Sequence, residues 1–175
     1  MLVGEMFDTR IILGIPIPFE SGVLLAVLAV HVAAGVGAVV SGAVAMLSPK
    51  RPGRHPTFGL LYYRCLLVVT ATMAVLSVVR WREDYHLFVL GLLSISVAIL
   101  GLSRVRHRPR ALRLHMIAFG SSYILLLTAF YVDNGRNLPL WDRLPSIAYW
   151  LLPSAIGVPL MIRVLLTHPL FRSRR

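Results

Sequence analysis

Histidine and tyrosine are the side chains best suited to chemistry in this sequence, and two histidines are spaced from tyrosines as if on one helix face. His55 precedes Tyr62 by seven residues, and His115 precedes Ser122 and Tyr123 by seven and eight. Residues at such spacings share one side of an α-helix. Imidazole and phenol groups bind ligands, carry protons and, for imidazole, coordinate metals. We therefore predict a polar site built from His55, Tyr62, His115 and Tyr123.

His31 is a further candidate because it lies deep within an apolar segment. It follows Gly22 by nine residues, which is about 13 Å along a helix. An ionisable residue at that depth in a membrane is either functional or a neutral imidazole that hydrogen-bonds to a neighbouring helix. Both interpretations stay open for His31. No catalytic residue can be assigned, and whether the protein is an enzyme stays undecided.

Five long apolar segments position these residues. Each has 18 to 26 residues, about the length that a helix needs to cross roughly 30 Å of hydrocarbon. The segments are 22–47, 60–79, 86–103, 114–132 and 147–166. They predict an all-α membrane protein with a single bundle of five transmembrane helices over residues 22–167. Residues 1–21 are predicted to lie along the outer interface, and residues 168–175 form a basic tail.

The charges give this bundle an orientation. Connections 48–59, 104–113 and 167–175 carry three, five and three Lys or Arg residues and no acid, whereas all seven acidic residues fall on the other side. Short loops rich in Lys and Arg stay in the cytoplasm. We therefore expect the amino terminus outside, the carboxyl terminus inside, and a location in the bacterial cytoplasmic membrane.

The composition fits a protein whose main partner is the lipid bilayer. The mean hydropathy is +0.76, and 57% of the residues are hydrophobic. A net charge of +11 would suggest nucleic acid in a soluble protein, but here the basic residues are spread over short loops between spans, so we predict no nucleic-acid partner. The single cysteine, Cys65, excludes an intrachain disulfide.

Small residues and aromatic rings give two further predictions. Ala29, Ala33, Gly37, Ser41 and Ala45 recur every four residues, and small residues let helices approach closely in lipid. We therefore expect the first helix at the centre of the bundle. The tyrosines at 62 and 63 are expected to mark the inner edge of the membrane, and the arginines at 64 and 163 to extend their charges to it.

The order of these motifs resembles a known family. The run His55–Tyr62 has the form HxxxGxxY, and His115–Tyr123 has the form HxxxxxxSY; both follow an intramembrane histidine in a helix of small residues. This order is similar to a family of predicted bacterial membrane proteins known as domain of unknown function 2306. The resemblance covers about residues 23–132. It implies a membrane protein of the same kind and lends no established activity.

Two histidines also raise the question of a b-type haem, because one iron can take two imidazoles from facing helices. The ligands must then lie at one depth. His31 and His115 differ by about 15 Å, and His31 and His86 by about 9 to 13 Å. Only the pair of His55 and His115 meets this requirement of equal depth, and that pair lies at the inner face. No zinc motif is present, so no metal site is predicted, and the cofactor stays unknown with haem as one alternative.

Transport is the other alternative. Five spans without a visible internal repeat are too few for an inverted-repeat carrier in one chain. A transporter of this size would be a homo-oligomer or work with a partner subunit in the membrane. A structural or accessory protein, whose histidines only pack, stays open as well.

Overall fold

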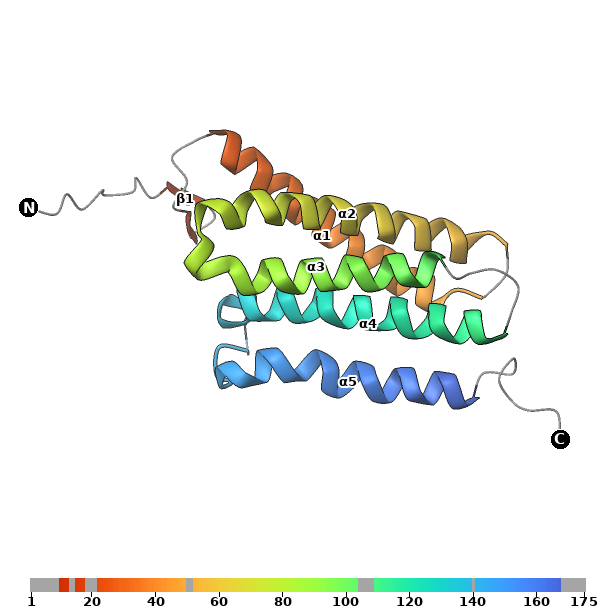
Figure 1. The fold of residues 1–175 in the computed structure, drawn as a ribbon. Helices are drawn as coiled ribbons and strands as arrows, with labels where there is room; N and C mark the ends of the chain where they lie inside the picture. Colours follow the sequence, from red (N-terminus) through yellow and green to blue (C-terminus); the bar gives the residue numbers. More distant parts are fainter. Residues whose placement is uncertain are drawn as a thin grey trace, which may run out of the picture.

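The computed structural model describes residues 10–12, 15–17, 22–49, 52–103, 109–139 and 141–167. Five long helices run back and forth along one direction, and each is long and apolar enough to cross a membrane (Figure 1). They are α1 (Gly22–Leu47), α2 (Arg54–Val79), α3 (Trp81–Ser103), α4 (Pro109–Asn134) and α5 (Ser146–Thr167). The prediction of an all-α membrane protein with five spans is confirmed.

The two ends of the bundle differ in charge. At one end α1 begins, α2 turns into α3, and α4 leads into α5 (Figure 1). We call it the acidic end, because the four acidic residues that the structure describes lie there: Glu83, Asp84, Asp133 and Asp142. We call the opposite end the basic end, since its connections carry Lys and Arg without an acid.

Three helices extend past the apolar segments of the sequence at their amino ends. α2 begins at Arg54, α3 at Trp81 and α4 at Pro109, each five or six residues before the corresponding apolar segment. An apolar segment marks only the hydrocarbon layer, whereas a helix can continue into the interface, where water satisfies its end groups. Asp84 therefore lies in the first turn of α3, and Asp133 lies in the last turn of α4, which ends at Asn134, two residues past its apolar segment.

A small hairpin precedes the bundle. Its strands are β1 (Arg10–Ile12) and β2 (Ile15–Ile17), which pair antiparallel with Arg10 opposite Ile17. Three residues span about 10 Å, so neither strand can cross a membrane. The tail at 168–175, with His168, and the connection that contains His107 lie outside the described residues.

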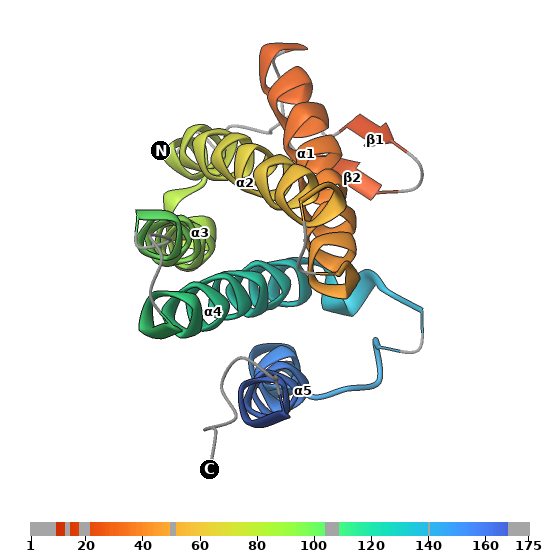
Figure 2. The same ribbon diagram turned by 90° about the vertical axis from the view of Figure 1, so that its right-hand side faces the viewer.

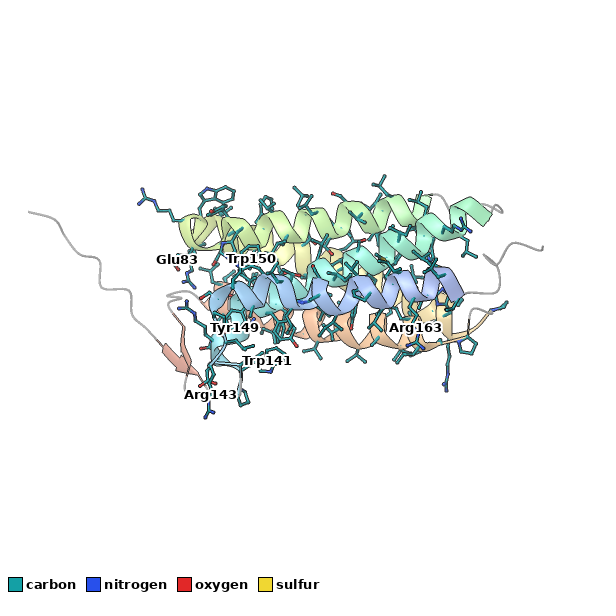
Figure 3. All side chains as sticks on the ribbon, turned by 90° about the horizontal axis from the view of Figure 1, so that it is seen from below. Glu83, Trp141, Arg143, Tyr149, Trp150 and Arg163 are labelled. Atoms are coloured by element: carbon teal, nitrogen blue, oxygen red, sulfur yellow. The ribbon has the colours of Figure 1, made fainter. Side chains whose placement is uncertain are left out.

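Aromatic rings gather at the acidic end. Figure 3 shows Trp141, Tyr149 and Trp150 at the end of the bundle that holds Glu83, with Arg163 toward the other end. A short 3-10 helix, η1 (Gly135–Asn137), follows α4, and the Tyr149 hydroxyl donates to the Trp141 carbonyl over 2.8 Å. These contacts close the connection onto α5. Such a belt of amphipathic rings is typical of a membrane interface.

The helices pack in chain order, which corrects the prediction for α1. Figure 2 shows α1 leaning across α2, with α3 and α4 following and α5 beyond α4. α1 is peripheral: its buried residues are Ala38, Ser41, Gly42 and Ala45, all in the half that leads to the basic end. Ala29 and Ala33 are exposed. The row of small residues therefore serves contacts with α2 and α4 over half its length, and the expected central position was wrong.

The core lies between α1, α2, α3 and α4. Tyr62, Leu66 and Ala98 are at most 2% exposed within it. The fully buried residues also include four serines: Ser41, Ser77, Ser94 and Ser122. Small hydroxyl side chains let helices approach closely and hydrogen-bond in the absence of water.

Gly42 is the closest contact between α1 and this core, and it yields the first prediction. A Cβ atom at Gly42 would lie 2.6 Å from Cε2 of Tyr123 and 3.0 Å from Cδ2 of Tyr62, whereas one at Gly35 would meet nothing within 4 Å. We expect Gly42→Ala to destabilise the protein by about 1–3 kcal/mol through overpacking. Gly35→Ala on the same helix is the matched control and should melt at or above the wild-type temperature in detergent. Equal melting of the two variants would contradict this packing.

Candidate functional site

His55 is held at the basic end by the end of the neighbouring helix. It lies in the first turn of α2, and its Nδ1 is 2.9 Å from the carbonyl oxygen of Ala45. Ala45 belongs to the last turn of α1, whose carbonyls have no partner within their own helix. A carbonyl only accepts, so Nδ1 of His55 carries the proton. In the neutral ring the lone pair is then on Nε2.

His115 has the same role on the other helix pair. Its Nδ1 is 3.3 Å from the carbonyl oxygen of Gly101 in the last turn of α3. A Cβ at Gly101 would lie 2.8 Å from Cβ of Ala118 and 3.0 Å from Cδ2 of Phe119. The absence of a side chain at Gly101 thus lets α4 approach closely enough for this bond. Nδ1 of His115 is again the donor, and Nε2 is the basic nitrogen of the neutral ring.

The two imidazole rings lie next to one another. Their centroids are 6.3 Å apart, and their planes make an angle of 77°. The Phe119 ring lies 4.6 Å from that of His115 and 6.1 Å from that of Tyr62. The sequence predicts His55 and His115 at one depth, and the structure places their rings together even though they lie one and six residues after the first residue of their helices.

The tyrosines lie farther into the bundle. Tyr62 is 2% exposed, so it does not mark the membrane edge as the sequence suggested. Its ring is 6.0 Å from that of Tyr123, and the Tyr123 hydroxyl donates to the Val39 carbonyl of α1 over 3.0 Å. The four residues predicted for the polar site therefore lie together, between α1, α2 and α4.

A chain of hydroxyls fixes the direction of the Tyr62 proton. Ser94 on α3 donates to the Ser122 carbonyl over 2.9 Å, so its oxygen can only accept from the Ser122 hydroxyl, 3.1 Å away. Ser122 has then used its proton, and Tyr62 must donate to it over 2.7 Å. The Tyr62 proton is thus committed to the serine pair. The hydrogen bonds of Tyr62 and Tyr123 join α2 to α4 and α4 to α1. Each tyrosine hydroxyl donates its proton in one of these bonds, so only its oxygen can still accept a hydrogen bond.

His31 is not part of this cluster. It lies in the half of α1 nearer the acidic end, where its Nδ1 is 2.9 Å from Oγ1 of Thr72 on α2. Of the five candidate residues, the structure therefore brings four together and places the fifth elsewhere.

Sequence reasoning missed Ser94, Phe119 and Gly42. Ser94 lies in an apolar segment where nothing distinguishes it from Ser96, whose hydroxyl donates to the Leu92 carbonyl of the same helix. The spacing of Phe119 could have indicated its place, because it follows His115 by one helical turn and so lies on the same side of the helix. Nothing in the sequence distinguishes Gly42 from the other small residues of its segment.

The arrangement limits the chemistry of the site. The four residues include no carboxylate and no cysteine; Cys65 instead packs against α1, with Sγ 3.0 Å from a Cβ placed at Gly37. Within the described ranges, no three His, Cys, Asp or Glu residues gather in a way that could hold a metal ion. The groups that the four residues bring together are thus two imidazoles and two phenols.

Comparison with known proteins adds no relative. No protein-family model matches the chain, and neither a curated protein nor a solved structure is detectably similar to it. Its function must be argued from its own residues.

The serine at the centre of the site gives the second prediction. Ser122→Ala removes the acceptor of Tyr62 and the donor to Ser94, so we expect a loss of about 1–2 kcal/mol of stability. Ser96→Ala is the control, because its exposed hydroxyl bonds only within α3. Thermal melting in detergent measures both. A Ser122 variant no less stable than the Ser96 variant would rule out a stabilising role for the hydroxyl chain.

Proposed function

We propose that the chain is a multi-pass protein of the bacterial cytoplasmic membrane, with the acidic end outside and the basic end in the cytoplasm. The support is the five apolar helices together with the one-sided distribution of Lys and Arg. The order of motifs through His31, His55 and His115 favours membership of the family that the sequence resembles. The basic end then faces the cytoplasm, and the histidine pair with it.

A thiol-labelling experiment tests this orientation. In a Cys65→Ser background, single cysteines replace Pro52 at the basic end, or Arg82 or Asn137 at the acidic end; all three positions are exposed. With a reagent that cannot cross the membrane, we expect labelling at 82 and 137 in intact cells and at 52 only after lysis. Labelling of residue 52 from outside would reverse the orientation.

For the histidine pair, we propose that it binds a haem iron, which makes this a small membrane haem protein. The observation that carries the proposal is that two helices place imidazoles 6.3 Å apart, each with Nδ1 directed to a helix-end carbonyl. A hydrogen bond from one imidazole nitrogen to a carbonyl is the usual way to orient the other toward a metal.

The geometry fits a haem better than a bare ion. Iron about 2 Å from each nitrogen, with each ring centre about 1 Å farther, places the two centroids about 6 Å apart. Each ring can turn about its bond to iron, so the 77° between the planes is acceptable. Two protein ligands are too few for a zinc site, but they suffice where a porphyrin supplies the other four.

Space and charge at the basic end also support a haem. Gly59 lies one turn beyond His55, on the face of α2 that carries Tyr62 into the core, yet a Cβ there would meet nothing within 4 Å. A propionate group would find positive charge at this end, where Arg54 is exposed. A bare divalent ion would instead meet positive charge without a carboxylate to balance it.

The residues around the pair suit electron transfer. His55 and His115 would hold the iron, and a haem bound by two imidazoles would supply one-electron redox chemistry. Tyr62 and Phe119 would separate the site from the rest of the core, because their rings lie directly beyond the histidines. The acceptor carbonyls of Ala45 and Gly101 would keep the imidazoles in one tautomer.

A spectrum of the purified protein is the test. We expect the full chain, produced with a haem precursor and purified in detergent, to show a Soret band that shifts on reduction, with about one haem per chain by pyridine haemochrome. His115→Gln keeps an amide donor for the Gly101 carbonyl and should fold, but it should lose at least about tenfold in haem content. His86→Ala, at the acidic end, is the matched control and should keep the haem.

Two outcomes would overturn the haem proposal. One is a folded protein that takes up no haem, even when hemin is added to it. The other is normal haem content in both His55→Ala and His115→Gln. A colourless protein of full stability would leave the pair as helix caps only.

A further inference from the structure

His31 lies inside the span of α1, far from the histidine pair. It follows the first residue of α1 by nine positions, about 13 Å along the helix. It precedes Ala45, whose carbonyl receives the bond from His55, by fourteen positions, about 21 Å. An ionisable side chain at such a depth is costly in a membrane and ordinarily marks a functional site. The role of His31 is therefore separate from that of the pair.

The hydrogen bond to Thr72 fixes the tautomer of His31. The Thr72 hydroxyl donates to backbone carbonyls of its own helix, Val68 over 2.7 Å and Val69 over 3.0 Å. Its oxygen must therefore accept from His31, so Nδ1 carries the proton in the 2.9 Å bond. In the neutral ring Nε2 then holds a lone pair, and it can only accept a hydrogen bond.

Nε2 of His31 reaches the surface of the bundle. It makes no hydrogen bond with the residues that the structure describes, and the side chain is partly exposed. Within those residues, the fully buried polar side-chain atom that lacks a partner is Oγ of Ser77, so Nε2 is accessible from outside. Hydrocarbon offers no water to such an acceptor, and a donor that reaches it from the membrane would stabilise it.

Apolar residues frame this nitrogen. Val68 and Val75, one turn before and one turn after Thr72 on α2, are both exposed. On α1, Gly35 follows His31 by one turn, and a Cβ atom there would meet nothing within 4 Å among the described residues. No neighbouring side chain of that part of the chain therefore covers the turn beyond His31. The bonded pair of His31 and Thr72 lies on an apolar surface that faces lipid.

A ligand that suits this surface is apolar and carries a hydrogen-bond donor. Phospholipid headgroups are held at the interface, whereas His31 lies about 13 Å along its helix from the end of the span. A quinone offers only carbonyl acceptors, which cannot pair with a nitrogen that itself accepts. A hydroquinone with an alkyl or isoprenoid tail is uncharged, dissolves in hydrocarbon and presents phenolic O–H donors.

We propose that His31 is the centre of a binding site for a lipid-soluble hydroquinone, one of whose hydroxyls donates to Nε2. Thr72 holds the imidazole in the accepting tautomer, and the ligand lies against the exposed valines of α2. Only binding is involved: no covalent bond forms or breaks, and no electron moves. The site does not depend on a haem at the basic end, because the two sites differ in depth and share no residue.

A binding titration of the full chain in detergent, under nitrogen and followed by NMR of isotope-labelled histidine rings, is the test. The probes are a decyl-substituted benzohydroquinone, its quinone and its dimethyl ether. We expect the hydroquinone to bind saturably and to shift the Nε2 signal of His31, which is assigned by its loss in His31→Phe. The quinone and the ether lack the donor, so they should bind at least about tenfold more weakly, as the loss of one hydrogen bond predicts.

Two threonine variants test the tautomer. Thr72→Val removes the acceptor that holds the proton on Nδ1, so the ring can take either tautomer. Its preference for hydroquinone over quinone should fall to about threefold or less. Thr70→Val is the matched control, because the Thr70 hydroxyl bonds to the carbonyls of Leu66 and Gly91 and not to His31. It should keep the wild-type preference.

The His31→Phe variant should fold, because the Thr72 hydroxyl still donates to Val68 when the imidazole is gone. Its affinity for the hydroquinone should fall at least about tenfold, to that of the ether. Equal affinities of the wild type for hydroquinone, quinone and ether would refute the site. So would undetectable hydroquinone binding, equally tight binding of a long-chain alcohol, or a Thr72 variant with an unchanged preference.

Discussion

Backbone carbonyls at helix ends need hydrogen-bond donors from outside their own helix, and at the basic end of this bundle histidines from adjacent helices serve two of these carbonyls. The last turn of a helix leaves four carbonyls without partners, and lipid offers none. α1 and α3 meet this requirement in the same way, through His55 and His115. The two bonds link α1 to α2 and α3 to α4 at this end of the bundle. The placement of the histidine pair follows from that.

The helix pairs α1–α2 and α3–α4 are equivalent in a way that the sequence does not show. Each has a histidine that caps the preceding helix, and seven residues later each has a residue of the central hydrogen bond, Tyr62 in one pair and Ser122 in the other. The side chains differ so much in size and type that no internal repeat is visible in the sequence. The equivalence lies in position and hydrogen bonding.

The sequence was sufficient for the five spans and for the grouping of four site residues. Both depend on local patterns: hydropathy over a helix length, and spacing along one helix face. It was insufficient for α1, because in a membrane an apolar or small residue suits a lipid-facing position as well as a helix contact. Ala29 and Ala33 continue the row of Ala45 but face outward. Hydropathy also does not mark where a helix ends, so it places Asp133 on a connection although α4 continues to Asn134.

The pairing of Tyr62 with Ser122 has a consequence for how such a bundle can be assembled. A dimer of two identical helix hairpins would place the same residue at both positions: two tyrosines would overfill the space and two serines would leave it empty. Only a large residue facing a small one fills it, and Ser94 then occupies the third position of the hydrogen-bonded chain on one side alone. The two hairpins must therefore differ in sequence. Joining them in a single polypeptide guarantees that each molecule contains one of each kind.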